Sequence, residues 1–128
     1  MEENELGLHK IAKTFNKKIE ETQAKIFDGS LRSGNKLEYE GTIVITGDVN
    51  AGAEVIAGGN VIVVGALRGL AHAGASGNKG AIIAASAIVA AQVRIADIVK
   101  EIERYDEDEE DEEIKKRAYI NNDIIIME

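Results

Sequence analysis

The residue types that most often carry out chemistry are sparse in this chain of 128 residues. It contains two histidines, His9 and His72, and no cysteine. A nucleophile–base pair, a thiolate metal site or a zinc-binding histidine pair needs such residues at defined spacings, and the sequence contains none of these patterns. A lone histidine in a glycine-rich stretch is more typical of packing or of a surface than of a catalytic base. The sequence therefore predicts a protein that is not an enzyme, with no cofactor and no metal.

The glycine-rich stretch Gly74–Gly80 has the composition of a phosphate-binding loop. Such a loop requires a lysine directly after its last glycine and then a hydroxyl residue. Here Lys79 precedes Gly80, and Ala81 follows it. This order argues against a nucleotide-binding loop, and corners of a repeated β structure explain the glycines better.

A short polar segment, Arg32-Ser33-Gly34-Asn35, is a better candidate for binding another protein. Arg32 offers a fork of hydrogen-bond donors, Ser33 and Asn35 offer short polar groups, and Gly34 lets a partner's backbone come close. A capped turn before a strand has the same composition, so the segment alone leaves both interpretations open.

The net charge of −8 comes from one segment, the eight acidic residues 106–113. The other acidic residues number 15 and match the 15 basic ones, so no basic footprint for nucleic acid is present. A block of like charges predicts a solvated loop. The sequence shows no apolar segment of membrane-spanning length and no signal peptide, which predicts a cytoplasmic protein.

An internal repeat begins at residue 41. Gly41–Val49 aligns with Gly59–Leu67 at an offset of 18, and Gly77-Asn78 follows Gly59-Asn60 at the same offset. A unit of this length fits three short strands and three corners, and stacked units bury their apolar side together. The repeat predicts an all-β parallel solenoid, with one more coil over residues 81–91 after a small insertion. Alternation within the strands predicts four inward side chains, Ile43, Ile45, Val61 and Val63.

The two ends of the chain differ from the repeat. Residues 1–30 are predicted to form a linker or helical leader, because one helical stripe accounts for Leu8, Ile11, Phe15, Ile19 and Ile26. Residues 31–128 are predicted to form the β domain. Ala118–Ile120 and Ile124–Met127 flank a turn signal, and this terminal segment is expected to cover one open end of the solenoid.

The apolar run 81–91 does not alternate as a strand with one wet face should. We expect an outward sheet face that a second copy covers about a twofold axis. The residues predicted for this dimer face are Ile82, Ile83, Ile88 and Val89. The alternative is that the C-terminal segment covers the same face within one chain.

Several stretches taken together resemble the C-terminal domain of the MinC family, bacterial inhibitors of septum formation. They are Arg32–Asn35, Gly47–Val55, Gly59–Gly65, Leu67–Ala75 and the closing strands. The resemblance covers about residues 31–128. It implies a right-handed, three-sided β-helix that forms a homodimer and binds the ATP-loaded form of MinD, which recruits it to the inner face of the membrane. It also implies a contribution to recognition of FtsZ.

The resemblance assigns a partner site. The family's MinD-contact motif falls on Arg32, Ser33, Gly34 and Asn35, where Asn35 replaces a glutamine. The assignment of Arg68, Gly69 and His72 to this site rests only on the motif match, and packing at a corner of the solenoid explains these residues equally well. Residues 1–30 are too few for the family's separate N-terminal domain, so the chain is expected to be a C-terminal fragment or a reduced relative.

Two other families remain as alternatives. A bactofilin-like β-helix would polymerise end to end through its open coils. A left-handed hexapeptide-repeat acyltransferase would also have coils of this length, but the hexad within each coil is missing.

Overall fold

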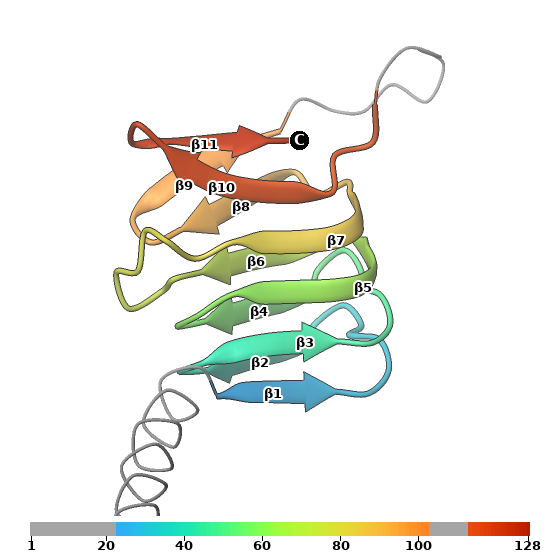
Figure 1. Cartoon of the computed structure of the whole chain (residues 1–128). Coiled ribbons are helices and arrows are strands. Elements are labelled where there is room, and N and C mark those ends of the chain that lie inside the picture. Colours follow the sequence, from blue (N-terminus) through green and yellow to red (C-terminus); the bar gives the residue numbers. More distant parts are fainter. Residues whose placement is uncertain (1–22, 103–112) are drawn as a thin grey trace, which may run out of the picture.

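Stacked β-coils make up the part of the chain that the computed structural model describes, residues 23–102 and 113–128 (Figure 1). Each coil contributes one strand to each of two sheets. The six-stranded sheet contains β1 (Ala24–Phe27), β3 (Thr42–Ile45), β5 (Val61–Leu67), β7 (Ile83–Ile88), β10 (Arg117–Asn121) and β11 (Ile124–Met127). The five-stranded sheet contains β2 (Lys36–Tyr39), β4 (Glu54–Ala57), β6 (Leu70–Ala73), β8 (Gln92–Ile95) and β9 (Ile98–Glu101).

The repeat found in the sequence is the register of the lower coils. Ile43 pairs with Val61 in one sheet, and Lys36 pairs with Glu54 in the other, both in parallel strands. A narrow third side joins the sheets, where single bridges connect Leu31 to Val49 and Val49 to Leu67. The predicted β-solenoid is therefore confirmed.

The core lies between the two sheets and is built from aliphatic ladders. Ile43, Ile45 and Val61 are fully buried, and Val63 is 2% exposed, as the alternation predicted. Burying each such side chain contributes roughly 2 kcal/mol relative to leaving it in water. The stacking of like residues on like residues explains why a core with so few aromatic side chains is continuous.

The third coil departs from the repeat. Val61 pairs with Ile83, at an offset of 22, because the loop 74–82 between β6 and β7 lengthens this coil. Gly77-Asn78 lies in that loop, so its predicted equivalence to Gly59-Asn60 is wrong. The residue next to Asn60 in the following coil is Ile82, whose N–H donates to the Asn60 side-chain oxygen at 2.9 Å.

The solenoid also begins earlier than residue 31. Ile26, which the spacing assigned to a helical stripe, lies in β1 and is 68% exposed. The N–H groups of Thr42 and Thr46 donate to the carbonyls of Gln23 and Phe27, which adds a strand below β3. A spacing of seven residues between two apolar side chains does not distinguish a helix from a strand. The other predicted helical residues lie outside the described ones, as does the acidic segment apart from Glu113.

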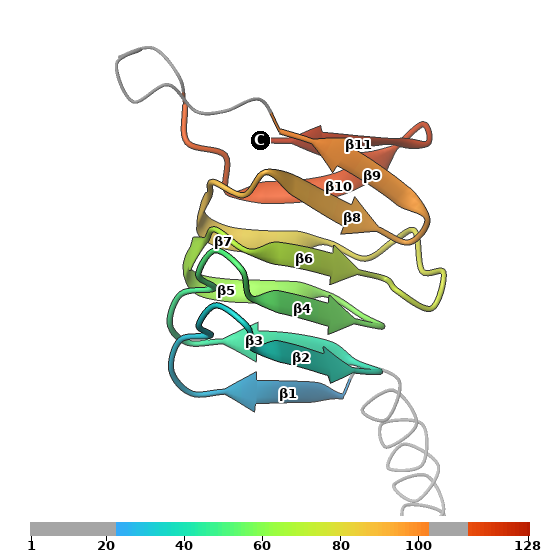
Figure 2. The ribbon, with the colours of Figure 1, turned by 180° about the vertical axis from the view of Figure 1, so that it is seen from behind.

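Antiparallel strands close the C-terminal end. β10 pairs with β7, β11 pairs with β10, and β9 folds back on β8, as Figure 2 shows from behind. The β10–β11 turn consists of Asn122 and Asp123 with φ of 53° and 61°, the geometry of a tight hairpin turn. Side chains from these strands and their ends pack on the core, namely Ile98, Ile102, Ile120 and Met127. The predicted closing segment is confirmed.

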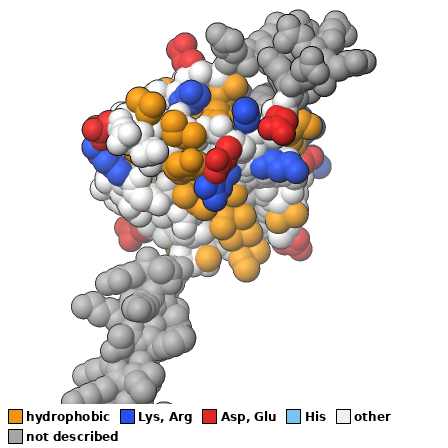
Figure 3. All heavy atoms as spheres, turned by 45° about the horizontal axis from the view of Figure 1, so that its top comes forward, with side chains coloured by type: hydrophobic (Ala, Val, Ile, Leu, Met, Phe, Trp, Pro, Cys, Tyr) orange, Lys and Arg blue, Asp and Glu red, His pale blue; other side chains and the backbone are white. Residues whose placement is uncertain are grey.

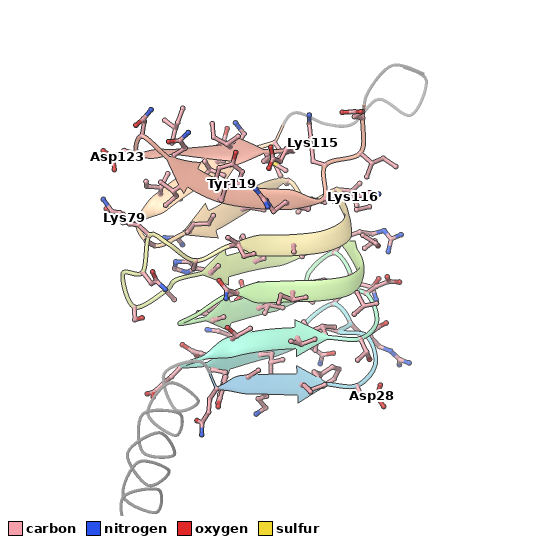
Figure 4. All side chains as sticks on the ribbon, in the orientation of Figure 1. Asp28, Lys79, Lys115, Lys116, Tyr119 and Asp123 are labelled. Atoms are coloured by element: carbon pink, nitrogen blue, oxygen red, sulfur yellow. The ribbon has the colours of Figure 1, made fainter. Side chains whose placement is uncertain are left out.

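A second contact ties this closing hairpin to the inserted loop. The Lys79 ammonium lies 3.5 Å from the Asp123 carboxylate, and Figure 4 shows the two side chains where the loop meets the β10–β11 turn. Both groups are largely exposed, so the pair contributes well under about 1 kcal/mol. Within residues 23–102 and 113–128, no helix has the length and apolar character needed to cross a membrane.

Candidate partner-binding site

The predicted dimer face does not form as a surface. Ile83 and Ile88 are 0% and 4% exposed because both point into the core from β7. Ile82 is half-buried, and only Val89 is well exposed, at 40%. The sequence of residues 81–91 shows no alternation of apolar and polar residues, because alanines occupy the outward positions 84 and 87 beside the inward isoleucines. The prediction is therefore wrong for Ile83 and Ile88.

An apolar face exists elsewhere, on the outside of the six-stranded sheet. The register aligns Ile26, Val44, Ile62 and Ala84 in one outward column across β1, β3, β5 and β7. Val64, in β5, is 60% exposed. Figure 3 shows hydrophobic side chains gathered on the side of the molecule that faces the viewer in Figure 1. Sequence inspection missed this column because each strand contributes only one or two members.

The segment Arg32–Asn35 forms a tight, exposed turn between Leu31 and β2. The Asn35 N–H donates to the Arg32 carbonyl at 2.9 Å, and the Arg32 N–H donates to the Asn35 side-chain oxygen at 2.9 Å. Gly34 has φ of +89°, a conformation that favours glycine. The Asn35 side-chain oxygen therefore closes the turn, and Arg32 and Ser33 are held at its start.

The next coil stacks an equivalent turn on this one. Asn50–Ala53 has the same closing bond, from the Ala53 N–H to the Asn50 carbonyl, and Gly52 has φ of +86°. The Gly34 N–H donates to the Gly52 carbonyl at 3.0 Å, which joins the two turns. A side chain on Gly52 would collide with the Ser33 hydroxyl.

Arg68 and Gly69 continue the stack in the third coil. Both of their N–H groups donate to the Val49 carbonyl, at 2.8 and 3.1 Å. Gly69 is buried, and a Cβ there would collide with the carbonyls of Asn50 and Ala53. Gly69 is thus required for the close approach of the two coils.

We call this surface the arginine corner: residues 32–35, residues 50–53, Arg68 and Gly69. Arg32, Asn50 and Arg68 each follow a residue of the ladder on the third side. They therefore form one column, and coils about 4.8 Å apart place the two arginines about 10 Å from each other along it. Asn50 was missed by the sequence analysis, although its offset of 18 from both arginines was a usable signal.

The charges at the corner are unevenly paired. The Arg68 guanidinium lies 3.7 Å from the Asp48 carboxylate, with half of each side chain exposed. The other Asp48 oxygen accepts the Ala66 N–H at 2.7 Å, which fixes the carboxylate. Arg32 makes no ion pair within the described part of the chain. An exposed guanidinium with a short polar neighbour can bind a carboxylate of another protein through paired hydrogen bonds.

His72 does not belong to this corner. It lies in β6, on the outer side of the five-stranded sheet, and its Nε2 is 2.8 Å from the Ala96 carbonyl. Since a carbonyl only accepts, the ring nitrogen is the donor. Ala96 has φ of +54° at the β8–β9 turn. The bond therefore gives His72 a structural role in holding that turn.

Comparison with known proteins gives a family match over most of the chain. Residues 25–128 match the model of the family described as septum formation inhibitor MinC, C-terminal domain. A probable septum site-determining protein MinC of Caldanaerobacter subterraneus subsp. tengcongensis is 46% identical over 109 residues, which cover 85% of this chain and 50% of that protein. One of Sulfurihydrogenibium sp. is 34% identical over 145 residues, covering 99% of this chain and 72% of that protein.

A solved structure is similar as well. It is described as the MinC:MinD cell division protein complex of Aquifex aeolicus, with a TM-score of 0.73 and 36% identity over 84% of this chain and 86% of that one. The chain spans about half the length of several of the curated relatives it matches.

Proposed function

The chain belongs to the MinC family through the family's C-terminal domain, and on that premise we propose that it binds MinD through the arginine corner. In this proposal it takes part in preventing septum formation at wrong sites, and ATP-loaded MinD recruits it from the cytoplasm to the membrane. The observation that carries the proposal is the column Arg32–Asn50–Arg68, with both arginines exposed, on a structure similar to a chain of a MinC:MinD cell division protein complex.

The physics of the corner supports this role. Two stacked turns hold the backbone on both sides of Ser33, so the Arg32 side chain starts from a fixed position. A pre-ordered binding surface loses less conformational entropy when a partner binds. Because Arg32 has no intramolecular carboxylate in the described residues, a partner's carboxylate does not have to displace one.

The test is co-sedimentation of the chain with MinD on liposomes in the presence of ATP. Arg32→Ala should lower the affinity about 30-fold or more, because truncating a hydrogen-bonded charged contact costs about 2–5 kcal/mol. Lys79→Ala, which removes an exposed cation from the loop between β6 and β7, is the matched control and should sediment as wild type. Unchanged sedimentation of Arg32→Ala would exclude this site.

The same proposal includes a homodimer, now assigned to the outer face of the six-stranded sheet. The column Ile26–Val44–Ile62 is apolar, and the exposed Val64 adds to it. A twofold axis lets such a face cover itself with a second copy. A second copy also explains why outward positions of three successive strands carry Ile or Val rather than polar residues.

Light scattering of the purified chain over a range of concentrations tests the dimer. Ile62→Asp should convert a dimer to a monomer, because the dimer would have to bury the unpaired charge of the aspartate in its interface. Ile56→Asp is the matched control, because Ile56 is equally half-buried but lies on the outer side of the other sheet. A wild-type chain that remains monomeric at all concentrations would remove the dimer from the proposal.

Recognition of FtsZ is the third element of the proposal and has no assigned residues. It rests on the family to which the chain belongs. Binding of the chain to a peptide of the FtsZ tail, measured with and without MinD, is the direct test. Absence of binding in both conditions would restrict the role of the chain to recruitment and dimerisation.

A further inference from the structure

Above Arg68, the third side of the solenoid carries an apolar residue where the lower coils carry polar ones. Ile88 is the next residue of the ladder, paired with Leu67, and the exposed residue that follows it is Val89. In the column that begins with Arg32, Asn50 and Arg68, Val89 is therefore the fourth member. Its N–H donates to the Leu67 carbonyl at 2.9 Å, which holds it directly above the corner.

The segment before β10 adds one further member. The N–H groups of Ile88 and Ala85 donate to the carbonyls of Lys115 and Lys116, so this segment lies against the end of β7. Val89 follows Ile88 and Ile114 precedes Lys115, so these two residues flank the same hydrogen bond. Ile114 is 51% exposed. Figures 1 and 2 both show this segment on the side of the solenoid where the turns of the lower coils lie.

We propose that Val89 and Ile114 form an apolar step that extends the arginine corner and binds an apolar side chain of the same partner. This inference rests on the proposed function, since the partner is the one that the corner binds. The partner must therefore present a carboxylate that faces Arg32 or Arg68. It must also present an aliphatic or aromatic side chain about one to two coils further along the solenoid.

The arrangement resembles the usual anatomy of protein interfaces. A single exposed valine or isoleucine needs no explanation, but two that flank one hydrogen bond above two arginines give this end of the corner an apolar character. Interfaces combine apolar residues and arginine, and a few such residues supply most of the binding energy. Lys115 and Lys116 flank the step and are exposed, so an acidic partner is favoured there as well.

The experiment measures MinD affinity at several salt concentrations for the wild-type chain, Val89→Ser, Ile114→Ser and the matched control Val99→Ser. Val99 is 47% exposed, but it lies in β9 on the five-stranded sheet. Each step variant should bind about tenfold more weakly, with the salt dependence of the affinity unchanged, because an apolar contact is not screened. Arg32→Ala should bind more weakly and also show a smaller salt dependence.

The outcomes separate the two proposals. Wild-type affinity in both step variants, together with a loss in Arg32→Ala, overturns the apolar step and leaves the corner in place. Wild-type affinity in Arg32→Ala with a loss in the step variants overturns the corner and retains the step as a contact. No MinD binding by the wild-type chain overturns both. Circular dichroism and light scattering of each variant show that the fold and the oligomeric state are retained.

Discussion

Lys25 and Lys100 lie at opposite ends of the solenoid. In the coils between them, the residues aligned with each lysine by the strand register are aliphatic and point into the core. Lys25 pairs with Ile43, below the inward ladder that continues through Val61. Lys100 pairs with Val93, at the other end of an inward ladder in the second sheet. The Lys25 ammonium lies 5.9 Å from the centre of the Tyr39 ring, at the base of the first coil.

Inward-pointing charges at the ends of a sheet are a known protection against edge-to-edge association. Together with the antiparallel closure at the C-terminal end, the two lysines argue against the end-to-end polymer of the bactofilin-like alternative.

Lys25→Ile should therefore promote association through the end of the solenoid that carries β1. The substitution extends the apolar ladder to the edge and removes the charge that must be desolvated when a second molecule stacks there. Light scattering should show species larger than wild type, increasing with concentration. Lys36→Ile, the same change at an outward position of β2, is the control and should leave the size unaltered. A Lys25→Ile chain of wild-type size would contradict this role for the lysine.

Two glycines with nearly the same backbone conformation should respond differently to alanine. Gly34→Ala places a side chain in open space, so only the strain of a positive φ remains, about 1 kcal/mol. Gly52→Ala has the same strain and also a collision with the Ser33 hydroxyl, and should lower the free energy of unfolding by about 3 kcal/mol. Urea unfolding of both variants measures the difference. Equal losses would show that Ser33 moves away without cost.

Asn60 links three coils through its side chain. Its side-chain oxygen accepts the Ile82 N–H at 2.9 Å, and its side-chain N–H donates to Thr42 Oγ1 at 3.4 Å. Asn60→Ala leaves the partly buried Ile82 N–H without its acceptor and should lower the free energy of unfolding by about 1–2 kcal/mol. Asn60→Asp keeps the acceptor oxygen and should lose less. The prediction fails if both variants melt at the wild-type temperature.

One substitution in the β10–β11 turn should make the folded protein more stable. Asp123 has φ of 61° as the second residue of a two-residue turn, where glycine is preferred after asparagine. Asp123→Gly should raise the free energy of unfolding by up to about 1 kcal/mol, since the lost pair with Lys79 is exposed and weak. Thermal unfolding of Asp123→Gly, with Lys79→Ala to measure the ion pair separately, tests this. A lower melting temperature for Asp123→Gly than for Lys79→Ala would contradict it.

Predictions that depended on neighbouring residues in the chain were the reliable ones. The inward positions of Ile43 and Val61 follow from alternation within one strand, and the closing turn at Asn122 follows from its local composition. The alignment of Gly77 with Gly59 failed because a periodic pattern carries no information on where a loop lengthens one coil. The assignment of Ile83 and Ile88 to a surface failed for a related reason: outward alanines hid the alternation of β7.

The amino-acid sequence by itself determined the period of the repeat, the aliphatic inward ladders, the turn at Arg32–Asn35 and the closing hairpin, because each depends on local spacing and residue type. Only the tertiary structure decided which residues of different coils become neighbours. Hydrogen-bond register between coils puts Arg32, Asn50 and Arg68 in one column, and it ends two buried ladders in Lys25 and Lys100. Register is a property of two strands at once, so no single segment could specify it.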